Sequence, residues 1–280
     1  MKLTRRQILR WGTGAAIGVA GIDAFAIEPR FLDVTRWNVI VPKLPPELEG
    51  FTIAHLTDIH LSGIGMLHRA IARAVAEAKP DLVAITGDVI DSDENLPFVT
   101  ELAGMLKDSA KRVIATLGNW EHWGNVNVTA LAAAYEKGGA KLLGDESLLV
   151  DRGLELVATD DSASGSANIH RALRDAARDR PRLFLTHAPG ILEGPLPRDL
   201  EAALTLAGHT HGGQVRAGPA AIVVPPGSGS FVKGVYTSAV GPLYVSRGIG
   251  TSVIPARFLC RPELPFFTLR GGDDANIVSA

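Results

Sequence analysis

Short hydrophobic runs alternate with segments of helical periodicity through the first two thirds of the chain. Segment 51–60 has the composition and alternation of a β-strand, and the apolar positions Ile64, Leu67, Ile71 and Val75 that follow it have helical spacing. Strands separated in this way by helices form βαβ units, whose strands are parallel in one sheet. We predict strands at 51–60, 81–86, 112–117, 154–159, 183–186 and 202–207, and helices at 64–80, 97–110, 128–137 and 168–178.

The last third of the chain has a different pattern. Apolar runs at 221–224, 243–247 and 265–269 are separated by short turns rich in Gly and Pro, which predicts strands without intervening helices. We expect these strands to complete a second sheet packed on the first. Segment 31–46 alternates loosely and ends in prolines, which favours an edge strand followed by a turn. Residues 272–280 are expected to form a flexible tail.

The composition limits the class of protein. Of the 280 residues, 46% are hydrophobic and 21% are charged, as in a typical globular domain, which we place at 31–271. The formal net charge is −2 and the body of the chain has no run of Lys or Arg, so nucleic acid is not expected as a bound partner. Cys260 is the only cysteine, which excludes an intramolecular disulfide and a multi-cysteine metal site.

Residues 1–26 resemble an export signal. A basic start is followed by an apolar run rich in Gly and Ala and by small residues around Ala26, the order found in secretory signal peptides. The pair Arg5-Arg6 resembles the twin-arginine signal, which is recognised by the machinery that exports folded proteins. Several glycines and Asp23 interrupt the apolar run, which disfavours a membrane-spanning helix. We expect export to the periplasm or cell envelope, with membrane anchoring if the signal is not cleaved.

Polar side chains that bind metals follow most of the expected strands. Asp58 and His60 are two residues apart, so an extended chain places both on one side. His209 and His211 lie in a glycine-rich turn after another strand. The carboxyl ends of parallel strands meet at one edge of a sheet, and imidazole is a common ligand of divalent transition metals. The candidate ligands are Asp58, His60, Asp88, Asn119, His187, His209 and His211.

The candidate ligands lie in short motifs with a distinctive order. These motifs are Asp58-x-His60, Gly87-Asp88, Gly118-Asn119, His187 and Gly208-His209-x-His211. As an ordered set they resemble the calcineurin-like metallophosphoesterases. Segments 245–252 and 261–264 also resemble the bacterial branch of that family that includes exported, twin-arginine-dependent phosphoesterases. The resemblance implies an α/β fold, a four-layer α/β/β/α sandwich, with a dinuclear metal site at the carboxyl ends of the strands.

The resemblance also implies a role for each ligand. The first metal would be held by Asp58, His60 and His211, the second by Asn119, His187 and His209, and both by Asp88. Two divalent ions about 3.5 to 4 Å apart need a shared anionic ligand, and mixed nitrogen and oxygen ligands suit Mn, Fe or Zn. A hydroxide that bridges the ions is then the nucleophile. The implied reaction is metal-dependent hydrolysis of a phosphodiester, a phosphomonoester or a pyrophosphate.

Position 120 departs from the family pattern. Family members commonly have Gly-Asn-His followed by an acidic residue, and that histidine contacts the phosphate and assists the leaving group. Here the residue is Trp120, whose indole N–H can contact a substrate but cannot transfer a proton near neutral pH. Three explanations remain open: His122 reaches the site as the catalytic residue, the substrate has a good leaving group, or catalysis is degraded.

Two alternative functions follow from the same residues. A lipid-linked nucleotide pyrophosphatase would have an apolar groove beside the metals. A catalytically weak metal- or phosphate-binding envelope protein would keep the ligands without turnover. The expected partner is therefore a phosphorylated small molecule or lipid, and peripheral membrane association is left open. Trp120 and Arg247 are the candidate substrate contacts, whereas His55 is expected in the core or beside a ligand because its parity in the strand is opposite to that of Asp58.

Overall fold

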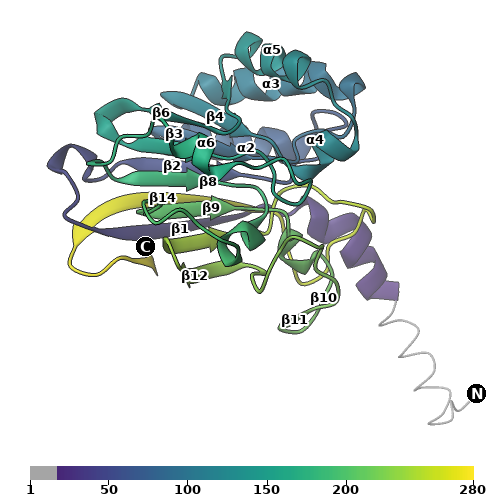
Figure 1. The fold of residues 1–280 in the computed structure, drawn as a ribbon. Helices are drawn as coiled ribbons and strands as arrows, with labels where there is room; N and C mark the ends of the chain where they lie inside the picture. The colour runs from purple at the N-terminus through teal and green to yellow at the C-terminus, as the bar shows by residue number, and fades with distance from the viewer. Residues whose placement is uncertain (1–17) are drawn as a thin grey trace, which may run out of the picture.

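Two β-sheets form the centre of the structure, a computed structural model that describes residues 18–280 (Figure 1). In spatial order, the first sheet contains β15 (Asn276–Ser279), β1 (Asp33–Pro42), β14 (Glu263–Gly272), β2 (Thr52–Leu56), β3 (Leu82–Thr86), β4 (Arg112–Thr116) and β5 (Lys141–Leu142). The second contains β12 (Gly234–Ser238), β13 (Gly241–Val245), β9 (Leu204–Ala207), β8 (Arg182–Leu185), β7 (Glu155–Ala158) and β6 (Glu146–Leu149). A separate pair consists of β10 (Arg216–Ala217) and β11 (Ala220–Ala221).

The two sheets pack face to face. In β2, Ile53 points into the core between the sheets and meets residues of the second sheet such as Leu206, whereas its neighbour Ala54 belongs to the core under the helices. This alternation follows from the two-residue period of a strand. Both faces of β2 and β3 are therefore buried, which explains their nearly continuous apolar runs.

Helices cover the outer face of the first sheet (Figure 1). Ile71, Leu102 and Leu131, from three different helices, share one apolar cluster with Val83 of β3. The outer face of the second sheet carries only a short helix within the described residues, because the helix predicted at 168–178 ends at Leu173. The α/β architecture of two sheets with helices is as predicted, with a thin fourth layer. The helices are α2 (Met66–Ala78), α3 (Leu96–Lys107), α4 (Asn119–Trp123), α5 (Val128–Lys137) and α6 (Ile169–Leu173).

The strands that carry the candidate ligands are parallel neighbours. The strands β2, β3 and β4 run in parallel in the first sheet, and β7, β8 and β9 do so in the second. Their carboxyl ends open at one edge of the sandwich, which is where parallel sheets place ligands. The predicted βαβ organisation is confirmed for this part of the chain.

The last third of the chain is divided between the sheets, which corrects the prediction that it completes the second sheet alone. The strands β12 and β13 extend the second sheet, but β14 lies in the first, parallel to β1 and antiparallel to β2. As a result β1 is not the predicted edge strand. Segment 272–280, predicted as a flexible tail, contains β15, which pairs with β1 and buries Ile277 against the core between the sheets.

The apolar run at 221–224, predicted as a strand, is also different. Only its first residue is in a strand, the two-residue β11, and Ile222 and Val223 are 61% and 71% exposed. Pro225 and Pro226 follow directly, and proline cannot donate a hydrogen bond to a neighbouring strand. This apolar segment therefore lies on the surface rather than in a sheet.

The predicted signal segment is described only in part. Residues 1–17, with Arg5 and Arg6, lie outside the described residues. Residues 18–22 are helical, and the Ala24 carbonyl beyond them accepts a hydrogen bond from the backbone N–H of Arg257 at 2.9 Å. The buried Glu28 carboxylate accepts backbone N–H groups of Leu259 and Cys260. From residue 18 onward, no helix has the length and apolar character needed to cross a membrane.

Candidate metal centre

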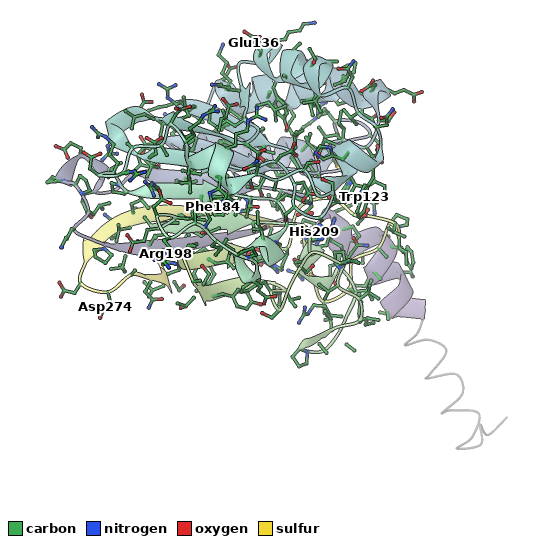
Figure 2. The ribbon with its side chains drawn as sticks, in the orientation of Figure 1. Trp123, Glu136, Phe184, Arg198, His209 and Asp274 are labelled. Atoms are coloured by element: carbon green, nitrogen blue, oxygen red, sulfur yellow. The ribbon has the colours of Figure 1, made fainter. Side chains whose placement is uncertain are left out.

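The seven candidate ligands come together at the carboxyl ends of the strands. In the first sheet, Asp58 and His60 follow β2, Asp88 follows β3, and Asn119 follows β4. His187 and the double-histidine turn follow β8 and β9 of the second sheet. Figure 2 shows His209 at the right-hand end of the molecule, near Trp123 of α4. The site therefore lies where the edges of the two sheets meet.

Two groups of side chains are able to hold a metal ion, with their ligand atoms within 4.8 Å of one another. One group is Asp58, His60, Asp88 and His211, and the other is Asp88, His187 and His209. The amide oxygen of Asn119 joins the second group, because it lies 3.0 Å from His187 Nε2 and 2.7 Å from His209 Nδ1. Only Asp88 belongs to both groups, the position expected of a bridging carboxylate. That these side chains hold two ions stays a prediction.

Backbone carbonyls fix the orientation of two histidines. His187 Nδ1 lies 2.7 Å from the Thr86 carbonyl, which only accepts hydrogen bonds, so Nδ1 carries the hydrogen. Its Nε2 then faces the Asp88 carboxylate at 3.2 Å. His209 Nε2 donates in the same way to the Pro226 carbonyl at 2.7 Å. Histidines that bind metals are oriented by such contacts of their other ring nitrogen.

The environment of His187 requires a positive charge at Nε2. Burial lowers the pKa of His187, but the charge of Asp88 and its hydrogen bond outweigh burial and hold this pKa well above its usual value. A divalent ion supplies the same positive charge without a proton. Burial also raises the pKa of Asp58 to about 7, and an adjacent cation would lower it again. The donor set therefore fits a metal.

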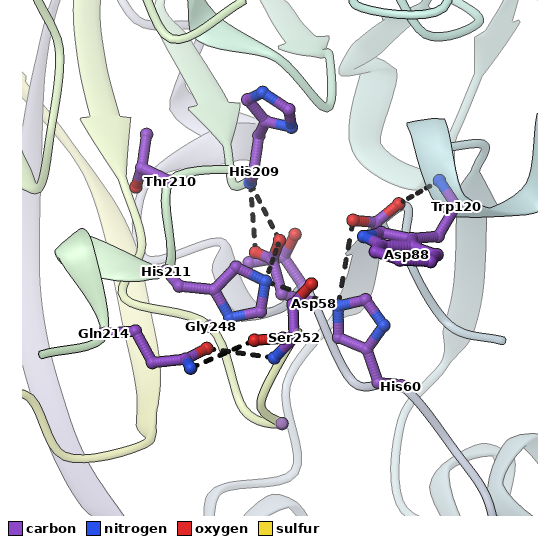
Figure 3. A network of polar contacts seen from close by, with 12 residues as sticks. Asp58, His60, Asp88, Trp120, His209, Thr210, His211, Gln214, Gly248 and Ser252 are labelled. Carbon is purple, nitrogen blue, oxygen red and sulfur yellow. Dashed lines mark hydrogen bonds and ion pairs between the residues drawn. The ribbon is translucent and has the colours of Figure 1, made fainter. Parts of the chain in front are cut away.

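The other two histidines face each other across the first group. His60 Nε2 and His211 Nε2 are 3.3 Å apart, and His211 Nε2 is also 3.3 Å from Asp58 Oδ1. Burial is the main cause that lowers the pKa of both imidazoles, so both are neutral near pH 7. In Figure 3 the His211 ring points toward Asp58 and His60, whereas the His209 ring points away from them. The double-histidine turn thus serves both groups.

The backbone at the site has unfavourable dihedral angles. Residues with a side chain rarely have a positive φ, which costs roughly 1 to 3 kcal/mol and persists only where the surrounding structure imposes it. Such angles concentrate at functional sites. Five of the seven candidate ligands have them: Asp58 (52°), His60 (48°), Asp88 (52°), His209 (70°) and His211 (49°).

Two glycines of the motifs allow the ligand loops to approach each other. A Cβ atom at Gly118 would clash with the Asp88 carboxylate, and one at Gly208 would clash with Thr57 and Asp58. The loops after β2, β3, β4 and β9 consequently pack without side chains at these two points. The glycines in the motifs are explained by this close approach rather than by flexibility.

Glu121 connects two of the ligand loops, a role that sequence reasoning missed. Its buried carboxylate accepts the backbone N–H groups of Asp88, Val89, Ile90 and Gly118 at 2.6 to 3.2 Å. The loop after β3 is thereby fixed to the start of α4. Burial raises the pKa of Glu121 to about 7, and the nearby charge of Asp88 acts in the same direction. Its place in Gly118-Asn119-Trp120-Glu121 was the available clue.

The comparison with known proteins identifies the family. A family model described as calcineurin-like phosphoesterase matches residues 51–213, which is more than half of the chain and includes every candidate ligand. The chain belongs to the calcineurin-like phosphoesterase family. Its fold is the calcineurin-like fold, and the predicted resemblance is confirmed at the level of the family.

Two relatives match this phosphoesterase over nearly their whole length. The uncharacterized metallophosphoesterase YkuE of Bacillus subtilis is 28% identical, and the match covers 96% of this chain and 98% of YkuE. The phosphodiesterase YaeI of Escherichia coli is 30% identical, with 95% of this chain and 99% of YaeI covered. The family and these relatives support the assignment of the chain as a hydrolase of phosphoric esters with a divalent metal site.

Trp120 of the phosphoesterase lies beside the first group of ligands. Its backbone N–H donates to Asp88 Oδ1 at 2.8 Å (Figure 3). Its ring contacts His60 edge to face with centroids 5.9 Å apart, and contacts Trp123 at 5.8 Å. The indole lines a cavity of about 500 Å³ that also exposes Asp88 and His211. Trp120 thus lines the cavity next to the candidate ligands, and its contact with a substrate stays a prediction.

The other two predicted contacts lie elsewhere. His122 Nε2 is 2.6 Å from Asp160 Oδ1, and His122 belongs neither to the two groups nor to the cavity lining. The Arg247 guanidinium pairs with Asp33 and Glu263 at 2.6 and 3.1 Å. It too is outside the cavity lining, so the structure gives Arg247 a role in joining β1, β14 and the loop after β13. Catalysis by His122 stays a prediction.

His55 lies in the core, as its parity predicts. It is fully buried, and its Nε2 is 2.8 Å from the Thr86 hydroxyl. Burial lowers the pKa of His55 to about 3, so the imidazole is neutral in the folded protein at physiological pH. The Thr86 carbonyl contacts His187 Nδ1, so Thr86 connects His55 to a candidate ligand.

Proposed function

We propose that the protein hydrolyses a phosphodiester or a pyrophosphate with two divalent ions, Mn, Fe or Zn. The observation that carries the proposal is the arrangement around Asp88, whose Oδ2 faces ring nitrogens of both His187 and His60, at 3.2 and 3.8 Å. When bound, two such ions lower the pKa of a shared water, supply a hydroxide nucleophile and neutralise phosphoryl oxygens.

The chain positions the ions and leaves their positive charge only partly neutralised. In the proposal, Asp58, His60 and His211 hold one ion, Asn119, His187 and His209 hold the other, and Asp88 holds both. Asn119 is neutral, so the ligands supply only two carboxylates against two divalent ions. The pair keeps a net positive charge, which attracts a phosphate anion.

Trp120 supports a substrate with a good leaving group. A general acid typically contributes about 10²- to 10⁴-fold to a rate, and indole cannot supply this contribution. His122, the other candidate acid, pairs with Asp160 instead of lining the cavity. A phosphodiester or pyrophosphate whose leaving group departs as a stable anion does not require the acid. The name of the relative YaeI, a phosphodiesterase, supports the diester.

The decisive experiment combines metal content with turnover. The purified protein, reconstituted with Mn, Fe or Zn, is expected to contain close to two equivalents and to hydrolyse bis-p-nitrophenyl phosphate. Metal content of one equivalent or none would overturn the dinuclear assignment. Two equivalents without turnover would favour a metal- or phosphate-binding envelope protein instead.

We also infer export to the periplasm or cell envelope from the sequence of residues 1–26. Arg5-Arg6 and the apolar run after them support recognition by the twin-arginine machinery. In a bacterial host, replacement of both residues by Lys is expected to retain a reporter fusion in the cytoplasm. Arg10→Lys is the matched control and should leave export unchanged. Equal export of all three fusions would contradict the inference.

A further inference from the structure

The cavity at the metal centre has a divided lining. One side carries Asp88, Asn119, His209 and His211, which belong to or touch the two ligand groups. Most of the rest is apolar. The apolar residues are Trp120, Trp123, Val215, Ile222, Val223, Pro225, Val253 and Ile254. A molecule that fills this cavity therefore meets the candidate ligands on one side and an apolar wall on the other.

The charge of the lining distinguishes between classes of substrate. Among residues 18–280, the side chains that line the cavity include no Lys and no Arg. Nucleotides and polyphosphates carry several negative charges, and sites for them generally use basic side chains. A molecule with one phosphoester next to a hydrocarbon chain matches the lining better, because its single charge can be met at the ligands.

The apolar wall continues onto the surface at the mouth of the cavity. Val253 is 90% exposed, Ile254 is 51% exposed, and Trp123 is 55% exposed. Together with Ile222 and Val223 they form an exposed apolar surface of five residues at the mouth of the cavity, the rim. Monomeric soluble proteins rarely expose contiguous apolar patches unless the patch binds something. The rim thus indicates a bound molecule whose own hydrocarbon part covers these exposed apolar side chains.

The rim is held in place by polar contacts behind it. The Gln214 side chain donates to the carbonyls of Ser252 and Ile254 at 3.1 and 2.8 Å, and accepts the Ser252 N–H. Figure 3 shows the contacts of Gln214 with Ser252 beside the ligand His211. The exposure of Val253 and Ile254 is therefore imposed by the fold next to the metal centre.

The loop that carries Val253 and Ile254 continues to a contact with the N-terminal segment. Ala24 contacts Arg257, three residues after Ile254, and the helical residues Val19 and Ile22 nearby in sequence are 68% and 61% exposed. The N-terminal sequence before them is apolar with a basic start. Exposed apolar side chains thus occur both on the rim and on the helical segment that leads to Ala24, which favours a lipid as the source of the occupant.

We propose that the substrate is an amphiphile, a phosphoester with a hydrocarbon chain, whose chain lies against the rim while its phosphate lies at the ligands. This inference rests on the proposed function and specifies its substrate class. Each methylene removed from water strengthens association by about fourfold. Burial of only two or three methylenes on the rim is therefore expected to raise kcat/KM for a long-chain substrate over a short-chain one by at least about tenfold.

The test uses two substrates with the same leaving group. Ethyl p-nitrophenyl phosphate and dodecyl p-nitrophenyl phosphate, the latter below its micelle concentration, differ only in the alkyl chain. With the metal-loaded full-length protein, kcat/KM for the dodecyl ester is expected to exceed that for the ethyl ester at least tenfold. Turnover of both esters with equal kcat/KM would overturn this inference and leave the proposed function intact.

Variants test whether the rim causes the preference. In the double variant Val253→Ser and Ile254→Ser the dodecyl-to-ethyl ratio of kcat/KM is expected to fall toward one. Leu149→Ser is the matched control, because Leu149 is 50% exposed on β6 and lies outside the cavity lining. If the dodecyl-to-ethyl ratio of kcat/KM is unchanged in the double variant, the dodecyl chain binds elsewhere and the assignment to the rim is overturned.

A binding measurement separates this inference from catalysis. Dodecyl phosphate is expected to shift the tryptophan emission of the protein to shorter wavelength, since Trp120 and Trp123 line the cavity, whereas ethyl phosphate is not. The shift should be lost in the double variant and kept in Leu149→Ser. If neither p-nitrophenyl ester is hydrolysed but the emission shift follows this pattern, the proposed function fails and the amphiphile site stands. Absence of any shift overturns the site.

Discussion

Asp88 Oδ2 lies 3.2 Å from His187 Nε2, and the Thr86 carbonyl holds the opposite nitrogen of that ring. The carboxylate and the imidazole come from different sheets, so this pair closes the edge between them. The same Asp88 oxygen faces His60. The geometry makes Asp88 the residue on which both groups depend.

Asp88→Asn is therefore expected to lower hydrolysis of bis-p-nitrophenyl phosphate by at least about 100-fold, because an amide does not supply the shared negative charge. The metal content of the same sample should fall from two equivalents to one or none. Asp179→Asn, an exposed residue, is the control and should match the wild type in both measurements. A variant that keeps two equivalents and full turnover would remove Asp88 from the bridging role.

Trp120→His is expected to restore a proton donor at the leaving group. The gain should reach at least about tenfold for diesters with an alkyl alcohol as leaving group and be small for p-nitrophenyl esters, which depart without a proton. Rates for the two leaving groups provide the measurement. No gain in Trp120→His, together with collapse of activity in His122→Ala, would instead assign the acid to His122.

Glu121→Gln tests how the ligand loops are positioned. The carboxylate accepts four backbone N–H groups, and a glutamine would turn its NH₂ group toward some of these donors. We expect metal affinity to fall about 10- to 100-fold, as for other partners behind metal ligands. Titration with Mn while following activity measures this change. Glu136→Gln, on the exposed face of α5, is the matched control and should bind metal as the wild type does (Figure 2).

His55 predicts part of the pH dependence of stability. Its pKa is lowered from 6.5 to about 3 by burial, so below about pH 6.5 the unfolded chain binds a proton that the folded protein does not. The free energy of unfolding should therefore decrease on acidification, by about 1.4 kcal/mol per pH unit from His55 alone until the pH approaches 3.

The measurement is urea unfolding of metal-free protein at several pH values between neutrality and about pH 5. His55→Gln keeps a polar group able to hydrogen-bond the Thr86 hydroxyl but does not titrate, so its unfolding free energy should decrease less steeply than that of the wild type. His170→Gln, an exposed histidine on α6, provides the comparison and should retain the wild-type slope. Equal slopes in all three proteins would contradict the assignment.

The meeting of the candidate ligands at one edge could be predicted from sequence because each lies within a few residues of the end of a buried strand. Local spacing places Asp58 with His60, and parallel order brings Asp88 and Asn119 to the same edge. The contacts that orient the ligands could not be predicted in this way. Thr86 and Pro226 act through backbone carbonyls, which every residue has and which leave no pattern in the sequence.

The pairing partners of the strands in the last third of the chain also could not be predicted from the sequence pattern. Alternation in 265–269 predicts a strand but does not say which neighbours it pairs with, since either sheet can bury Phe267 and Leu269. In the structure both lie between the sheets, and β14 pairs with β1 over ten residues. Exposed Ile222 and Val223 likewise have the composition of a strand, and only their place beside the ligands explains them.

The location of β14 couples assembly of the site to a long-range strand pairing. Residues 263–272 are far from β1 and β2 in the sequence, yet they fill the gap between these two strands. Until β14 has docked, β1 and β2 lack their common partner, and pairings between distant segments form slowly. The two candidate ligand groups are thus expected to assemble late in folding, which delays metal capture until the first sheet is complete.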